Sequence, residues 1–295
     1  MATKLAAVAL VLLSMGCSGS DATGGGGSGG ASATVGSGTG NATAASGTAS
    51  GPSGTTTGPG ATGATATSSS TGSGGPGLPP FGGSSGGSGG PAPVGGATAQ
   101  AGNVTYYLVV PASYSATQPT PFLLVFSGTE GGNQMTQNLI NVGPSTGTST
   151  FIRAVLDGVQ YNGNGAAGAT VLDAVRTQYN VDNDRTYLLG ESAGTSAAEQ
   201  LGFTLRESYF AAYWANDVNQ AATPAQNANA IGFQPWGQVG PGGQLAIAQQ
   251  IVAGMQTASY RLPNPAPYAG AGSTQHGAPQ QFIAAITWFP GKSRM

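Results

Sequence analysis

The sequence predicts an α/β domain in which a mostly parallel β-sheet carries helices on both faces. Three observations lead to this prediction. From about residue 104 onward, segments with the apolar pattern of strands alternate with segments that have helical periodicity. The run PFLLVF at 121–126 is almost wholly apolar, as expected for a strand that is covered on both faces. A strand-like run at 186–189 is followed directly by a tight glycine turn and an alanine-rich, helix-like stretch.

Seven segments have the composition of β-strands. They are rich in Val, Ile, Leu, Tyr and Phe, and polar or glycine-containing turns separate them. Asp157-Gly158 closes the third strand, and the turn from Asn180 to Asp184 leads into the fourth. In chain order, strands are expected at residues 104–110, 121–126, 151–156, 186–189, 209–215, 231–236 and 260–262.

Four segments are expected to be helices. The first places Val171, Leu172, Val175 and Tyr179 on one face, which is the apolar stripe of a helix that packs on a sheet. The second follows the glycine turn, the third is amphipathic, and the fourth closes the domain. In chain order, helices are expected at residues 167–179, 195–205, 244–255 and 279–288.

The N-terminus has the pattern of an export signal. Lys4, the apolar run 5–13 and Ser14-Met15-Gly16-Cys17 form a secretory signal that is too short to span a bilayer as a permanent helix. Cys17 is the only cysteine, so the chain cannot form an intramolecular disulfide. Its place after the apolar run predicts a bacterial cell-envelope lipoprotein in which Cys17 is lipidated and anchors the chain to a membrane. Ordinary signal cleavage and free secretion is the alternative.

Residues 18–98 are expected to form a linker. They consist mostly of Gly, Ser, Thr, Ala and Pro, with almost no large apolar side chain. Such a stretch cannot bury enough apolar surface to offset the entropy lost on ordering, so we expect it to be disordered. The folded domain is therefore expected to span residues 99–295, which is long enough for one full core.

Charge and metal-ligand content exclude several classes of function. The chain has 8 Lys plus Arg and 10 Asp plus Glu, with no basic run, so no nucleic-acid partner is expected. One His and one Cys cannot build a zinc site. We expect neither a metal nor a cofactor, and we expect a monomer.

The pentapeptide Gly190-Glu191-Ser192-Ala193-Gly194 lies between the predicted strand 186–189 and the alanine-rich stretch. This strand–turn–helix context is the one in which a Gly-x-Ser-x-Gly sequence presents a nucleophilic serine. A serine hydroxyl needs a base to take its proton. His276 is the only histidine of the chain and lies downstream of Ser192, so it is the candidate base by elimination.

Two longer segments resemble a known family. YYLVVPASYSATQPTPFLLVFSGTEGG and VLDAVRTQYNVDNDRTYLLGESAG, together with the late histidine, are similar to secreted esterases of the α/β-hydrolase superfamily. The most similar groups are the polyhydroxybutyrate-depolymerase-like esterases and the feruloyl and acetylxylan esterases. The resemblance covers about residues 103–217 well and the remainder in outline. It implies hydrolysis of carboxylic esters through an acyl-enzyme, without a cofactor.

The resemblance assigns roles to residues around the serine. Ser192 matches the nucleophile, and Ala193 matches the residue whose backbone N–H binds the oxyanion. The second oxyanion donor is expected in the loop at Gly128 and Thr129. The usual His-Gly opening of that loop is Ser127-Gly128 here, which keeps a backbone donor but loses the histidine.

The acid of the site departs from the family pattern. The resemblance places an Asp after the strand at 231–236, but this chain has no Asp or Glu beyond residue 217. The chain order serine, acid, histidine then leaves Asp217, because Glu199 and Glu207 fall in or just after the helix that follows Ser192. The alternative is that Asp217 is a turn residue and the site is a Ser–His dyad.

The sequence therefore predicts an α/β-hydrolase fold without a large lid domain, since no long insertion follows the strand at 209–215. The expected activity is a serine esterase that acts on short-chain, acetyl, feruloyl or polyester-type esters, either small or polymeric. A catalytically silent hydrolase fold that binds a surface or polymer is the alternative from another functional class.

Overall fold

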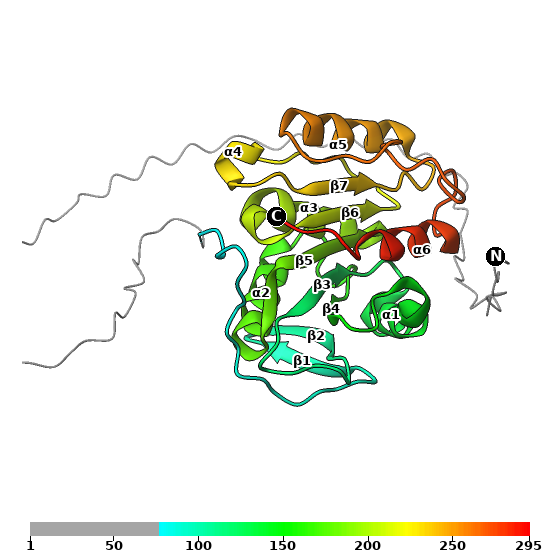
Figure 1. The fold of residues 1–295 in the computed structure, drawn as a ribbon. Coiled ribbons are helices and arrows are strands. Elements are labelled where there is room, and N and C mark those ends of the chain that lie inside the picture. Colours follow the sequence, from blue (N-terminus) through cyan, green and yellow to red (C-terminus); the bar gives the residue numbers. More distant parts are fainter. Residues whose placement is uncertain (1–76) are drawn as a thin grey trace, which may run out of the picture. The chain divides into compact units, whose positions relative to one another are not determined.

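The structure is a computed structural model that describes residues 77–295, so the predicted signal, Cys17 and residues 18–76 lie outside it. Its centre is a seven-stranded sheet with the strand order β1-β2-β4-β3-β5-β6-β7 (Figure 1). β2 pairs antiparallel with both β1 and β4, and all other pairs are parallel. The strands are β1 (Ala97–Ala101), β2 (Val104–Val109), β3 (Thr120–Phe126), β4 (Ile152–Leu156), β5 (Val181–Glu191), β6 (Ala212–Asn216) and β7 (Trp236–Val239).

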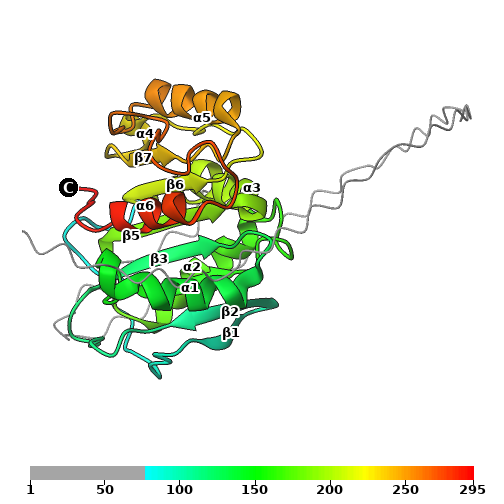
Figure 2. The same ribbon diagram turned by 90° about the vertical axis from the view of Figure 1, so that its right-hand side faces the viewer.

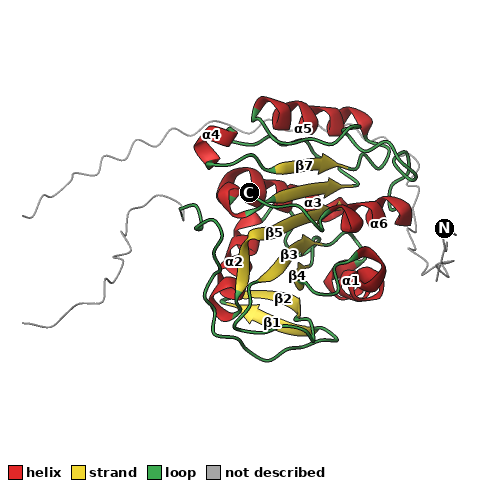
Figure 3. Cartoon of the chain, viewed as in Figure 1, coloured by secondary structure: helices red, strands yellow, loops and turns green. Residues whose placement is uncertain are grey.

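Helices cover both faces of the sheet, as predicted (Figure 2). One apolar core joins the sheet to α2, α3 and α5, and a second core joins its other face to α1 and α6. A π-helical turn, Leu201–Leu205, continues α3. The α-helices are α1 (Gly131–Thr146), α2 (Gly165–Gln178), α3 (Thr195–Gln200), α4 (Ala228–Ile231), α5 (Leu245–Thr257) and α6 (Pro279–Trp288) (Figure 3).

Most predicted elements are present, and three predicted segments differ from the structure. The predicted turn at Asn180–Asp184 is mostly strand, because β5 begins at Val181. The predicted strand at 231–236 is wrong: these residues hold the end of α4 and a loop, and β7 begins only at Trp236. The predicted strand at 260–262 is reduced to a single bridge between Trp236 and Arg261.

Local backbone chemistry explains the error at 231–236. The Asn227 side chain caps α4 by accepting a hydrogen bond from the Ala230 N–H at 3.1 Å. Gly232 then ends the helix in the left-handed conformation, with φ of 90°. Ile231 and Phe233 are both buried, so the apolar run that resembled a strand instead anchors a helix end to the core.

The folded part begins before the predicted boundary at residue 99. The Gly82 N–H donates to Asp184 Oδ2 at 2.6 Å, and Ser84 forms a bridge with Asp182. The Ser85 hydroxyl donates to the Tyr179 carbonyl at 2.7 Å. Residues 77–96, which composition assigned to the linker, are therefore bound to the domain at the start of β5.

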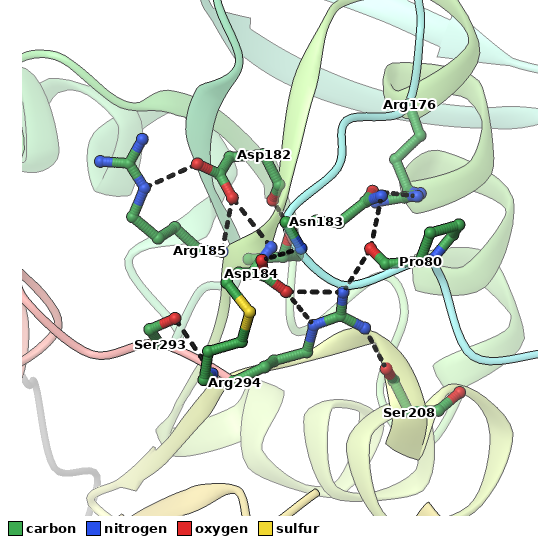
Figure 4. A network of polar contacts seen from close by, with 12 residues as sticks. Pro80, Arg176, Asp182, Asn183, Asp184, Arg185, Ser208, Ser293 and Arg294 are labelled. Atoms are coloured by element: carbon green, nitrogen blue, oxygen red, sulfur yellow. Dashed lines mark hydrogen bonds and ion pairs between the residues drawn. The ribbon is translucent and has the colours of Figure 1, made fainter. Parts of the chain in front are cut away.

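The C-terminal tail is fixed at the same place (Figure 4). Arg294 donates to Asp184 Oδ1 through Nε at 3.0 Å and through Nη2 at 2.8 Å, and its side chain is fully buried. The same guanidinium donates to the carbonyls of Pro80 and Ser208. One buried ion pair thus joins the N-terminal segment, β5 and the C-terminal tail.

The part of the chain that the structure describes has no helix long and apolar enough to cross a membrane. The connection between β6 and β7, residues 217–235, contains only the short helix α4. No lid domain stands there, in agreement with the prediction.

Candidate active site

The predicted site residues gather at one edge of the sheet. Because β3, β5 and β6 are parallel, their C-terminal ends share an edge, which is where open α/β sheets bind ligands. Ser127 follows β3, Ser192 follows β5 and Asp217 follows β6. The loop before α6 supplies His276.

Ser192 lies in a tight turn between β5 and a short 3₁₀ turn that leads into α3. Its φ of 47° is in the left-handed region that non-glycine residues rarely adopt. Both flanking glycines are required by close packing. A Cβ on Gly190 would lie 2.6 Å from the Ala198 Cβ, and a Cβ on Gly194 would lie 2.6 Å from the Phe126 carbonyl oxygen. The turn therefore has the tight strand–turn–helix geometry that the motif predicts for a nucleophile elbow.

Ser192 and His276 are in hydrogen-bonding contact. The Ser192 Oγ lies 2.7 Å from His276 Nε2, although the two residues are 84 positions apart. Ser192 is half-buried and His276 is exposed, so the pair is open to solvent. This is the geometry that a base needs to take the proton of a nucleophilic hydroxyl.

Asp217 lies against the loop that carries His276. It is 1% exposed, and its Oδ2 accepts a hydrogen bond from the Gly277 N–H at 2.5 Å. Its Oδ1 accepts from the side-chain amide of Gln281, on α6. The first bond holds the backbone next to His276 and the second ties Asp217 to α6; neither of them reaches the His276 ring. Asp217 therefore contacts the residue that follows His276 in the chain.

The loop after β3 is held by its own side chains. The Ser127 hydroxyl accepts a hydrogen bond from the Gly158 N–H at 3.0 Å and donates one to the Gly128 carbonyl. The Gly128 N–H, one of the expected oxyanion donors, donates instead to Glu130 Oε1 at 3.0 Å. Thr129, the other candidate in this loop, is exposed.

Glu130 brings a carboxyl group close to Ser192. A Cβ built on Gly128 would lie 2.5 Å from Glu130 Oε2 and 3.3 Å from the Ser192 Cβ, so both side chains flank the same glycine. Burial raises the pKa of Glu130, and the negative charges of Asp157 and Asp217 act in the same direction. Ala193, the expected donor on the other side, is half-buried at the start of the 3₁₀ turn.

Several polar residues of the site were not found from the sequence. Asn219 donates to the Ser192 carbonyl at 3.2 Å and accepts from the Thr195 hydroxyl at 3.0 Å. Asn162 donates to the Ala193 carbonyl at 3.1 Å. Glu130 and Gln281 belong to the same set. These residues come from separate segments, and no spacing in the sequence marks them.

Among residues 77–295, no group of three or more His, Cys, Asp or Glu side chains is arranged to hold a metal ion. The residues at this edge are those of nucleophilic and acid–base chemistry.

The sheet, the elbow between β5 and α3, and the chain order serine, carboxylate, histidine occur together in one arrangement. This is the α/β-hydrolase fold. No protein-family model and no curated protein sequence matches the chain.

Some solved structures with a similar arrangement are named as hydrolases. A thermostable esterase is 13% identical with a TM-score of 0.48, over 68% of this chain and 63% of that one. A dienelactone hydrolase-like promiscuous phosphotriesterase from metagenomic libraries is 15% identical with a TM-score of 0.47, over 67% and 97% of the two chains. A ferulic acid esterase from the anaerobic fungus Anaeromyces mucronatus is 12% identical with a TM-score of 0.46, over 66% and 89%. This chain spans less than two thirds of the length of the thermostable esterase. Similarities this distant do not identify a substrate for this chain.

Proposed function

We propose that this chain is a serine hydrolase that cleaves carboxylic esters through an acyl-enzyme. The observation that carries the proposal is the 2.7 Å contact between Ser192 Oγ and His276 Nε2 at a strained turn. A serine held in this way beside an imidazole is activated as a nucleophile.

In the proposed reaction, His276 Nε2 takes the hydroxyl proton as Ser192 Oγ attacks the ester carbonyl carbon. The negative charge that develops on the carbonyl oxygen faces the backbone N–H groups of Ala193 and Thr129. Collapse of this intermediate breaks the bond to the alcohol, and His276 returns the proton to the departing oxygen. Water then attacks the acyl-enzyme by the same route and frees Ser192.

Asp217 is proposed as the acid of the site. Its bond to the Gly277 N–H fixes the loop of His276, and its carboxylate offsets the charge that the ring gains during attack. A Ser–His dyad with Asp217 as a purely structural residue is the alternative. The alternative from another functional class is a hydrolase fold without catalytic activity. The observation that favours it is that the Gly128 N–H, an expected oxyanion donor, is already bound to Glu130.

The proposed substrates are short acyl, acetyl, feruloyl or polyester-type esters. The exposure of His276 and the short connection after β6 leave the serine accessible, which suits a small ester or the end of a polymer. Glu130 and Asp217 beside the site disfavour anionic substrates by charge repulsion.

Hydrolysis assays test this proposal. Purified protein is offered p-nitrophenyl acetate and butyrate, methyl ferulate and polyhydroxybutyrate, with Ser192→Ala and His276→Ala as controls. Hydrolysis that both substitutions abolish supports the serine esterase. Binding to the polymer with no hydrolysis of any ester supports the silent alternative.

We also propose that the chain is exported and held at a bacterial cell envelope through lipid on Cys17, which lies outside the described residues. The support is the sequence pattern alone. After expression in a bacterial host, the wild-type protein should partition into a detergent phase and Cys17→Ser should not. Equal partitioning of the two forms would leave free secretion as the explanation.

A further inference from the structure

We propose that Glu191 is a positioning residue, which donates a hydrogen bond from a neutral carboxyl group to Asp217 and thereby fixes the acid behind His276. The proposal rests on the proposed hydrolase function. It gives a role to the second residue of the pentapeptide, which neither the motif nor the proposed reaction uses.

Glu191 is the last residue of β5, and its register partner on β6 is Asn216. Its side chain is buried rather than directed into solvent. Oε2 accepts a hydrogen bond from Asn216 Nδ2 at 2.8 Å, and Asn216 Oδ1 in turn accepts from Trp214 Nε1 at 3.0 Å. The side chain of Glu191 therefore has one defined orientation.

Asn216 directly precedes Asp217, so this orientation puts the buried carboxyl groups of Glu191 and Asp217 in one polar cluster at the ends of β5 and β6. Two neighbouring buried carboxyl groups share a proton, because their simultaneous ionisation is opposed by charge repulsion. Burial, followed by the charge of Asp217, raises the pKa of Glu191 well above its ordinary value. The negative charge of Glu130 acts in the same direction. Glu191 is thus the member of the pair that keeps the proton.

The partners of Asp217 agree with this assignment. The Gly277 N–H donates to its Oδ2 and the Gln281 amide donates to its Oδ1, so both oxygens already act as acceptors. With Glu191 as the third donor, Asp217 is held from β5, from the histidine loop and from α6. Loss of the Glu191 donor frees one side of the carboxylate, so His276 is less firmly placed.

Two substitutions separate the hydrogen bond from simple packing. Glu191→Gln keeps an acceptor for Asn216 and a neutral donor for Asp217, whereas Glu191→Met keeps the length and removes both. We expect Glu191→Gln to keep kcat within about threefold of wild type, and Glu191→Met to lower kcat by about tenfold or more with KM little changed. Equal loss in both variants, or full activity in Glu191→Met, overturns the proposal.

A double-mutant cycle tests whether Glu191 acts through Asp217. In an Asp217→Asn background, Glu191→Met should cause no further loss of kcat, since the carboxylate that it positions is absent. If the kcat losses of the two single variants instead multiply in the double variant, the proposal is overturned.

A measurement that needs no activity distinguishes this inference from the proposed function. The infrared difference spectrum between wild type and Glu191→Gln at neutral pH should contain the band of a protonated carboxyl group. Absence of the band overturns the inference even if esters are hydrolysed. If the band is present and wild type hydrolyses no ester, the proposed function fails and the assignment of the proton to Glu191 is upheld.

Discussion

Ser192 and Asp217 end neighbouring parallel strands and share a left-handed backbone conformation, with φ of 47° and 49°. Among the described residues, Ser259 is the only other non-glycine residue with positive φ. Such conformations cost free energy and persist where the surroundings enforce them, often at functional sites. Two of the three strained residues thus lie at the edge where His276 meets Ser192, which favours a functional Asp217 over a simple turn.

Asp217→Asn should lower kcat by several orders of magnitude while leaving the fold intact. Asparagine adopts the left-handed region readily and has the same size, so the substitution removes little but the charge. In serine proteases the corresponding change lowers kcat by about 10⁴. Steady-state kinetics with p-nitrophenyl butyrate, checked by circular dichroism, measures the effect. A drop of less than about tenfold would identify a Ser–His dyad.

Glu130→Ala should raise kcat, because it frees the Gly128 N–H and removes a negative charge from the side where the oxyanion forms. The gain should grow as pH rises through the raised pKa of Glu130, since only the ionised carboxylate repels the oxyanion. Glu130→Gln is the matched control, which keeps an acceptor without the charge. An unchanged or lower kcat in Glu130→Ala would mean that the carboxylate does not obstruct the site.

Glu199→Gln should stabilise the protein more at alkaline than at acidic pH. Burial among apolar side chains raises the pKa of Glu199 to about 8. The folded state therefore holds this proton more tightly than the unfolded chain, whose Glu pKa is about 4.3. Wild type loses stability as pH rises from about 4.3 to about 8, and the loss then levels off.

Urea unfolding of wild type and Glu199→Gln at about pH 5 and about pH 8.5 measures this difference. The free energy of unfolding of Glu199→Gln relative to wild type should be larger at about pH 8.5 than at about pH 5, by on the order of a few kcal/mol. Glu207, whose pKa burial raises to about 7, is present in both proteins, so its contribution cancels. A difference that does not change with pH would show that Glu199 ionises normally in the folded state.

A chain that begins at residue 77 should be more stable than one that begins at residue 99. The shorter chain lacks the Gly82 N–H bound to Asp184 and the Pro80 carbonyl bound to Arg294. Each buried polar group that loses a hydrogen-bond partner costs about 1–3 kcal/mol. Urea unfolding of both chains measures the difference, with Arg294→Met in the longer chain as a control that breaks the same network. Equal stability of the two chains would show that residues 77–98 do not contribute to the domain.

The sequence was informative where local chemistry decides the structure. The all-apolar strand at 121–126, the turn around Ser192 and the single histidine each predict one feature with few alternatives. Helix α1 was not predicted, because its first two residues are Gly131 and Gly132 and Pro144 lies inside it. Packing of Met135 and Leu139 against the sheet stabilises a helix that local propensity does not favour.

The polar surroundings of the site could not be predicted in the same way. Gln281 and Asp217 are 64 positions apart, and Gly82 and Asp184 are 102 positions apart. Such contacts depend on how distant segments are brought together in the fold. The composition of residues 77–98 also led to a domain boundary that is too late in the chain. Gly82 and Ser85 bind the domain through a backbone N–H and a hydroxyl group, so this segment needs no large apolar side chain.

Covalent labelling of Ser192 is the most direct test of the proposal that His276 activates Ser192 as a nucleophile. A fluorophosphonate probe reacts with a serine that a neighbouring base activates, and peptide mass spectrometry locates the adduct. We expect one adduct, on Ser192, whose formation His276→Ala slows by orders of magnitude. No adduct on Ser192, or equally fast labelling in His276→Ala, would contradict the claim that His276 activates Ser192.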